Sequence, residues 1–297
     1  MHVYLNGKIV SSKEALVSVF DHGFLYGDGI YETMRVYDRV IFILDGHLQR
    51  LRRSASLIGL TIPLDTDGLK IVIYETLIVN ALRNAYVRLT ISRGQGELGL
   101  DPDLCPQPTV AIIAQELRGY PKTSYENGLS LIIPNTRRNL KEAINPQIKS
   151  LNFLNNILAK IEAKKQGAYE AVMLNARGKL TEGTICNLFF YKDGVVCTPS
   201  LACGILDGIT RGIVIELAKR EGLNVKEGAF TRADLYSAEE VFVTNTTMEV
   251  MPVSKVDSQK YTVGKISRLL RTFYRQEVNA YVSKAKAEGP SLWGQSD

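Results

Sequence analysis

The chain is predicted to be an α+β protein of two domains, and three features of its sequence support that class. Its 297 residues suffice for one large or two medium domains, each with its own core. Hydrophobic residues make up 45% and charged residues 23%, as in ordinary globular proteins. Strand-like and helix-like segments mix without a regular βα repeat, which argues against a doubly wound sheet.

The first part of the chain is predicted to be rich in strands. It opens with a hairpin whose turn pair is Asn6-Gly7. Residues 85–92 alternate strictly, with Val87, Leu89 and Ile91 on one face. Apolar side chains at helical spacing predict a helix over 45–60. Further strands are expected at 30–37, 39–44 and 109–115.

Residues 116–128 are the best candidate for a linker, because they are polar, contain Pro and Gly, and lack periodicity. This predicts a small N-terminal α/β domain over 1–115 and a larger C-terminal domain over 129–297. The last eleven residues, AEGPSLWGQSD, are expected to be a loose tail. Strands are expected at 129–134, 169–174, 186–191, 195–198 and 240–245, and helices at 151–166, 209–221 and from about 267.

Composition argues against several classes of function. The formal net charge is +5 and the arginine-rich spots are short, which favours a solvated face or a local anion site over nucleic-acid binding. Four cysteines without a CxxC pair and only three histidines argue against a metal site. A secretory leader and an 18-residue apolar run are both missing, so a cytoplasmic, reduced protein is expected.

Lys149 lies in the stretch NPQIKSLNFLNN, among Ile148, Leu151 and Phe153. A lysine that acts as a nucleophile must be desolvated, and these apolar neighbours could desolvate it. Taken alone, a surface lysine with a buried stem remains the simpler explanation.

Two further stretches could bind charged groups. In LDGITRG, residues 206–212, Gly208 leads into an amphipathic helix whose start could bind a phosphate, with Thr210 and Arg211 nearby. Asp207 as a plain N-cap explains the same pattern. Glu182 precedes an apolar strand, where a carboxylate needs a protonated ring nitrogen or an arginine as partner, unless it lies in an exposed turn.

Tyr86 and Arg88 form a polar face on the alternating strand 85–92. An arginine there could bind a carboxylate bidentately, or make a salt bridge to a neighbouring strand. A lysine, an acid and a helix start for phosphate are together the three groups that pyridoxal phosphate requires.

The sequence resembles the class IV aminotransferases, a pyridoxal-phosphate family that includes branched-chain aminotransferases, D-amino acid aminotransferases and aminodeoxychorismate lyases. The family pattern that starts at Glu182 and ends at Arg211 is filled at every position, and the resemblance extends to about Gln276. Its segments here are Glu182, Thr184, 187–189, 196–198 and 206–211, with VFDHGFLYGDGIYE, HLQRL, IKSLN and TNTTMEVMPV elsewhere.

The resemblance implies a role for each matching residue. Lys149 would carry the cofactor as a Schiff base and move the proton, and Glu182 would keep the pyridine nitrogen protonated. Leu206 would pack against the ring. The phosphate would be bound by Arg50, Ile209, Thr210 and Thr246. The family fold has two α/β domains with the cofactor between them, and a homodimer completes the pocket.

The resemblance is strongest to branched-chain enzymes, in which a Tyr-x-Arg pair such as Tyr86 and Arg88 lines the substrate pocket. The Arg-x-His pair of D-specific enzymes is replaced here by Leu98 and Leu100. Departures from the branched-chain pattern are Phe153, where a tyrosine is usual, and the turn with Thr247 and Met248. YETMR in place of FEGIR is another. Tyr31, Thr247 and Met248 are expected to contact substrate as well.

The implied function is a pyridoxal-phosphate transaminase of branched-chain amino acid biosynthesis that moves the amino group of an L-amino acid to 2-oxoglutarate. The second hypothesis is a D-amino acid aminotransferase or an aminodeoxychorismate-type lyase of the same fold. A non-catalytic binding module that kept the fold is the third. No metal, nucleic acid or membrane partner is expected.

Overall fold

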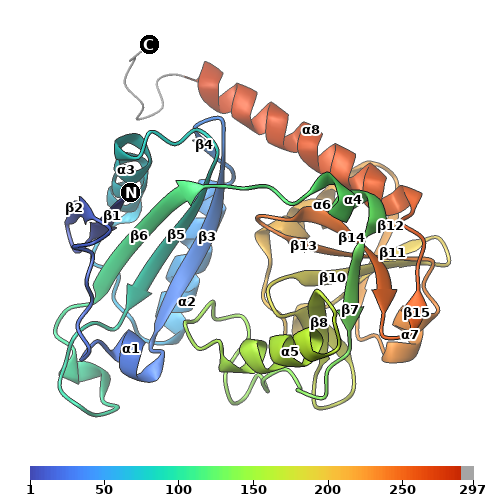
Figure 1. The fold of residues 1–297 in the computed structure, drawn as a ribbon, viewed down its shortest axis with the longest axis horizontal. Helices are drawn as coiled ribbons and strands as arrows, with labels where there is room; N and C mark the ends of the chain where they lie inside the picture. Colours follow the sequence, from blue (N-terminus) through green and yellow to red (C-terminus); the bar gives the residue numbers. More distant parts are fainter. Residues whose placement is uncertain (289–297) are drawn as a thin grey trace. The chain divides into compact units, whose positions relative to one another are not determined.

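A computed structural model of the chain describes residues 1–288. Contacts divide it into two compact units. The first comprises Met1–Arg118, Ile148–Asn152 and the described residues 278–288, and the second comprises Gly119–Gln147 and Phe153–Glu277. Both units combine sheets with helices, and the α+β prediction is confirmed (Figure 1).

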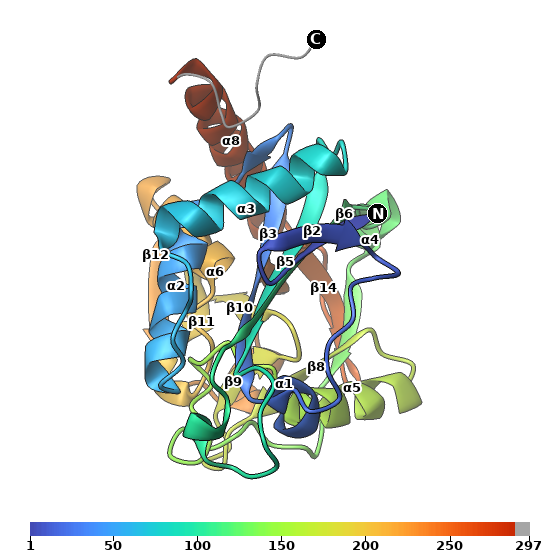
Figure 2. The same cartoon turned by 90° about the vertical axis from the view of Figure 1, so that its left-hand side faces the viewer.

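The first unit is built on a six-stranded antiparallel sheet in the order β2-β1-β6-β5-β3-β4. Helices α2 and α3 cover one face of this sheet (Figures 1 and 2). The strands are β1 His2–Leu5, β2 Lys8–Ser11, β3 Gly29–Tyr37, β4 Val40–Ile41, β5 Ala85–Ser92 and β6 Thr109–Glu116. The helices are α1 His22–Tyr26, α2 Leu44–Leu57 and α3 Thr66–Val79, with a short 3₁₀ turn at Pro102–Leu104.

The predicted hairpin and the predicted alternation are both confirmed. Asn6 and Gly7 have φ of 47° and 87°, the two left-handed positions that a tight two-residue turn requires. Val87, Leu89 and Ile91 are fully buried in the core between sheet and helices. Apolar burial along one strand face therefore sets the register of β5.

The unit boundaries differ from the predicted ones at three places. Residues 148–152 belong to the first unit because their backbone pairs with the start of β3, where Leu151 N donates to Gly29 O. Residues 278–288 also belong there, with Tyr281 packed edge-on against Phe42. The predicted linker, 116–128, contains helix α4, Lys122–Asn127.

The second unit is built on a nine-stranded mixed sheet in the order β12-β11-β10-β13-β14-β7-β8-β9, with β15 on β14. Strand β9 also pairs with β10, so six strands form a closed ring. The strands are β7 Leu129–Ile132, β8 Glu170–Leu174, β9 Leu180–Gly183, β10 Asn187–Lys192, β11 Val195–Pro199, β12 Asn224–Gly228, β13 Glu240–Asn245, β14 Glu249–Val256 and β15 Gln259–Lys260. The helices are α4, α5 Leu154–Lys165, α6 Ile209–Arg220, α7 Arg232–Tyr236 and α8 Lys265–Ala287, with a 3₁₀ turn at Leu201–Cys203.

Several elements were not predicted, notably α3, β9, β12 and β14. Helix α3 is apolar around much of its circumference, so its pattern lacks a clear polar face. Within residues 1–288, none of the helices is long and apolar enough to cross a membrane. The predicted loose tail starts at Ala287, but Ala287 is the last residue of helix α8, and the rest of the tail beyond Glu288 lies outside the described residues.

Candidate active site

Lys149 is held beside β3 in the first unit. Tyr31 N donates to Lys149 O at 3.0 Å, which fixes the backbone. The Lys149 Nζ lies 3.2 Å from the Tyr31 hydroxyl and 4.4 Å from the centroid of the Tyr31 ring. A Cβ on Gly29 would lie 2.7 Å from Leu151 Cδ1, so the close approach requires glycine. The half-buried amine is thus oriented by a phenol.

The predicted substrate residues of the first unit share one face of its sheet. Arg88 pairs with Thr33 and Tyr31 with Thr90, and residues directly opposite in an antiparallel pair point to the same side. Tyr86 lies two residues before Arg88, on that side. The Arg88 guanidinium lies 4.0 Å from the centroid of the Tyr31 ring. Tyr31 therefore contacts both the candidate nucleophile and the candidate substrate cation.

Arg50, predicted to bind phosphate, is engaged by a carboxylate that the sequence analysis missed. Glu32 is fully buried and accepts from Arg50 Nε and Nη2, both at 2.7 Å. His47 Nδ1 lies 2.8 Å from the same carboxylate. The sequence did contain one sign that Glu32 is unusual. It lies opposite buried Leu89 in the sheet, at a position where an apolar residue is usual. Glu32 fixes the orientation of the Arg50 guanidinium.

Burial and charge shift the pKa values of this cluster. Burial alone would raise the pKa of Glu32, but the charge and hydrogen bonds of Arg50, with a hydrogen bond from His47, outweigh it and lower the pKa. Burial also lowers the pKa of His47 below its ordinary 6.5, and the contact with Glu32 offsets this only in part. Glu32 is therefore ionised and His47 neutral at pH 7.

We expect the free energy of unfolding to fall as pH drops below about 6.5. The unfolded chain binds a proton at His47 there, whereas the folded chain does so only at lower pH. The His47→Gln variant should lose less stability between pH 7 and pH 5.5 in urea unfolding. Substitution of the exposed His2 is the control, and equal pH dependence in wild type and His47→Gln would contradict this assignment.

Glu182 lies on β9 in the second unit, with a side chain 7% exposed. One carboxylate oxygen accepts from Arg138 Nε and Nη2 at 3.0 and 2.9 Å. The other accepts from Asn187 Nδ2 at 3.3 Å and Leu206 N at 3.0 Å. The β9–β10 pairing places Asn187 opposite Glu182. Arg138 is the arginine partner that the sequence left open, and its guanidinium places a positive charge directly against the carboxylate.

The start of α6 is open for an anion. Its N-cap is Gly208 and not Asp207, so the simple N-cap explanation is wrong, and Gly208 provides no side-chain cap. First-turn N–H groups without a side-chain cap are a ready anion site. A Cβ on Gly208 would lie 2.0 Å from Asn187 Oδ1, so only glycine fits beside the residue that binds Glu182. Ile209 and the buried Thr210 form the first turn.

Two further residues predicted to bind an anion or substrate, Arg211 and Met248, have buried side chains. Arg211 is 3% exposed and donates to Glu227 and to Pro199 O, so its charge is already used. Met248 is fully buried in the hydrophobic core of the second unit. Asn245, which the sequence analysis missed, shapes the turn through bonds from the backbone N–H of Met248 and of Thr247. Thr246 and Thr247 lie half-buried in this turn.

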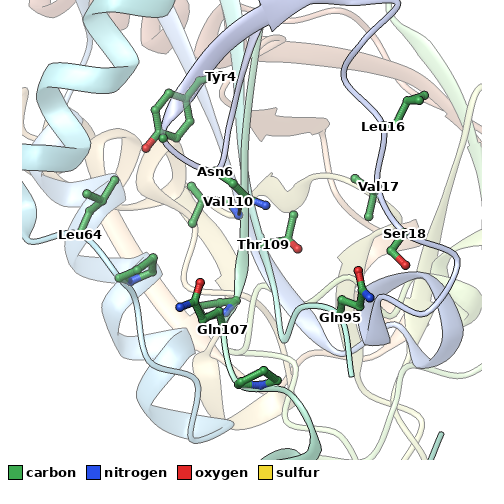
Figure 3. Close-up of a pocket in the computed structure, with 14 residues that line it drawn as sticks. Tyr4, Asn6, Leu16, Val17, Ser18, Leu64, Gln95, Gln107, Thr109 and Val110 are labelled. Atoms are coloured by element: carbon green, nitrogen blue, oxygen red, sulfur yellow. Dashed lines mark hydrogen bonds between the residues drawn. The ribbon is translucent and has the colours of Figure 1, made fainter. Parts of the chain in front are cut away.

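A cavity of about 630 Å³ in the first unit contains none of the predicted site residues. Tyr4 and Leu64 lie on one side of it and Leu16, Val17 and Ser18 on the other (Figure 3). Its lining includes no charged side chain, so it offers no partner for a phosphate or a carboxylate. Among the residues that the structure describes, no cluster of His, Cys, Asp or Glu is arranged for a metal ion.

The fold and the comparisons with known proteins together define an aminotransferase enzyme. The family model for amino-transferase class IV matches residues 29–256. The chain belongs to this family, and within it is most like the branched-chain enzymes.

Three relatives illustrate the range of the family. The chain is 46% identical over 278 residues to a Methanocaldococcus jannaschii protein whose assignment as a branched-chain-amino-acid aminotransferase is itself provisional, covering 93% of this chain and 96% of that one. It is 35% identical to the aminodeoxychorismate lyase of Bacillus subtilis, covering 98% of both. Identity to the D-alanine aminotransferase of Bacillus licheniformis is 34%, with 96% and 98% covered.

Two solved structures agree with this chain along most of its length. The branched-chain aminotransferase of Thermoproteus uzoniensis with norvaline has a TM-score of 0.89 at 34% identity, covering 94% of this chain and 95% of that one. The branched-chain amino acid aminotransferase of T.th. with pyridoxamine 5′-phosphate has a TM-score of 0.90 at 34% identity, covering 94% of each.

Proposed function

We propose that the protein is a pyridoxal-phosphate transaminase that moves the amino group of a branched-chain L-amino acid to 2-oxoglutarate. The observation that carries this proposal is Tyr31, whose ring contacts both Lys149 and Arg88. A candidate nucleophile and a candidate carboxylate-binding cation thus meet at one aromatic side chain. The likeness to branched-chain enzymes supports the substrate class.

The side chains present fit this cofactor. Pyridoxal phosphate, when bound, supplies an electron sink for the bond broken at the substrate α-carbon. Glu182, which is paired with Arg138, would hold a proton on the ring nitrogen of the cofactor. The start of α6 and Thr246 would bind the phosphate, and Arg50, oriented by Glu32, would contribute to the same contact. Leu206 would pack against the ring.

Lys149 would hold the cofactor covalently and would also act as the base. Its Nζ would take and return the proton at the substrate α-carbon. The Tyr31 hydroxyl, 3.2 Å away, orients the amine for this transfer. Phe153 contributes no hydroxyl, unlike the tyrosine usual in branched-chain enzymes.

Arg88 is proposed to bind the second carboxylate of glutamate. An apolar substrate has no such carboxylate, so its binding would depend on Tyr31 and Tyr86 and not on Arg88. We expect Arg88→Gln to lower kcat/KM for L-glutamate by about 10- to 100-fold, the effect of losing one charge-assisted hydrogen bond. The value for L-leucine should change by less than about threefold. The exposed Arg83→Gln is the control, and an equal loss for both substrates would refute this role.

The alternative is a D-amino acid aminotransferase or an aminodeoxychorismate-type lyase. The relatives at 34–35% identity and the turn with Thr247 support it. Leu98 and Leu100, which replace the Arg-x-His pair, argue against the D-specific branch. L-leucine, D-alanine and aminodeoxychorismate should be tested side by side, and faster turnover of D-alanine than of L-leucine would overturn our preference.

We also propose a homodimer in the cytoplasm. Helix α5 exposes Leu154, Ile157, Leu158 and Ile161, at helical spacing along one face. Such a stripe favours burial against another surface, and light scattering tests whether that surface is a second copy. All four cysteines are free thiols, as expected in a reducing compartment.

A further inference from the structure

The hairpin between β13 and β14 ends in a strained glutamate that the proposed transamination does not use. Asn245 pairs with Glu249 across the two strands, so residues 246–248 form a three-residue turn. Glu249 closes this turn at a φ of 61°, the left-handed position where such hairpins usually have glycine. A residue with a Cβ is disfavoured in this conformation and persists only where its surroundings hold it there.

Two arginines of α8 hold the Glu249 side chain. The glutamate is only 1% exposed, and its Oε2 accepts from Arg275 Nε at 2.9 Å. Arg271 Nε lies 3.8 Å from the same oxygen. The two arginines are four residues apart on one helix, so both reach the carboxylate from the same face of α8. These ion pairs connect the end of the turn to α8.

The turn is also held at its third residue, Met248. The hydroxyl of Tyr125, a residue of α4, donates to Met248 O at 3.1 Å. The Arg271 guanidinium lies 3.6 Å from the centroid of the Tyr125 ring. Arg271 therefore contacts both Glu249 and the side chain that binds Met248 O, and these contacts form one connected network behind the turn.

The first end of the turn is fixed by Asn245. Its side-chain oxygen accepts from Thr247 N at 2.9 Å and from Met248 N at 2.7 Å. Between the two fixed ends lie Thr246, proposed to bind the cofactor phosphate, and Thr247, proposed to contact substrate. Because both belong to one short turn, a shift of its backbone would displace the two contacts together.

We propose that Glu249 is a positioning residue, whose contacts with Arg271 and Arg275 hold the turn 246–248 in the shape that presents Thr246 and Thr247 to their ligands. Glu249 acts through the turn and not by contact with cofactor or substrate. This inference rests on the proposed function, because it takes the ligands of the turn from there. The alternative is that the ion pairs only stabilise the fold of the second unit.

The variants Glu249→Gly and Glu249→Gln test the positioning role. Glycine adopts the left-handed φ without strain but releases the turn from α8, whereas glutamine keeps the side-chain size and loses the charge. We expect the dissociation constant of pyridoxal phosphate, measured by equilibrium dialysis of the cofactor-loaded enzyme, to rise at least about fivefold in both. The KM for L-leucine should rise as much, while kcat with saturating cofactor and substrate changes by less than about threefold.

The matched control is Asp193→Gly in the exposed turn between β10 and β11. Asp193 also has a left-handed φ, 50°, in a hairpin of the same unit. Relief of its strain should leave the dissociation constant of pyridoxal phosphate and the KM for L-leucine within about twofold of wild type. A general effect of removing strain in the unit is thereby separated from a specific effect on the turn 246–248.

Tyr125→Phe tests the same turn without altering Glu249. It removes the hydroxyl that binds Met248 O, so the dissociation constant of pyridoxal phosphate should rise about two- to tenfold. A dissociation constant within about twofold of wild type in folded Glu249→Gly and Glu249→Gln would overturn the positioning role. If both Glu249 variants fail to fold, unchanged affinity in Tyr125→Phe would overturn it instead. A wild-type protein that binds no pyridoxal phosphate would refute the proposed function itself, and this inference with it.

Discussion

Replacement of Lys149 by alanine is expected to abolish the half-reaction, with a fall in rate of at least about 10⁴-fold. This is the upper end of what one positioned acid–base group contributes, and the covalent attachment of the cofactor is lost as well. The wild-type protein, purified with pyridoxal phosphate, should be yellow and should bleach when L-leucine is added. The variant should keep its absorbance in single-turnover spectra.

The matched control is Lys141→Ala, which removes an exposed lysine eight positions earlier in the same loop region. It should bleach at the wild-type rate. Thermal unfolding separates loss of chemistry from loss of fold, because the Lys149 side chain makes one hydrogen bond, to Tyr31. Turnover by Lys149→Ala within about tenfold of wild type would remove Lys149 from the mechanism.

Glu182→Gln is expected to lower kcat by about 10²- to 10³-fold, the range seen when one preorganised electrostatic contact to a transition state is removed. A neutral amide cannot keep the ring nitrogen protonated. It also leaves Arg138, only 10% exposed, without its carboxylate, which should destabilise the second unit by about 3 kcal/mol. Single-turnover kinetics and urea unfolding measure the two effects separately.

Two further variants show whether the lower kcat of Glu182→Gln comes from the lost carboxylate or from the broken ion pair with Arg138. Arg138→Gln retains the carboxylate with its contacts to Asn187 and Leu206 N, so it should slow the reaction by only about tenfold. Glu142→Gln, which changes an exposed glutamate, should leave kcat unaltered. If Glu182→Gln loses stability but retains wild-type kcat in the folded fraction, Glu182 is structural.

Patterns within single elements were readable from the sequence. Three features depend only on residues that are close together in the sequence. They are the Asn6-Gly7 turn, the alternation of β5 and the helical spacing of α2. Helix α3 was missed because its apolar side chains spread around the helix. The pairing of 148–152 with β3 was also missed, since it joins segments more than a hundred residues apart.

The sequence by itself identified the family pattern, and through that pattern it predicted Lys149 and Glu182 as site residues. Only the tertiary structure identified their partners. Arg138 meets Glu182 across 44 residues and Tyr31 meets Lys149 across 118. The physical reason is that such partners are set by strand order and register, which bring together distant parts of the chain and leave no periodic signal near either residue.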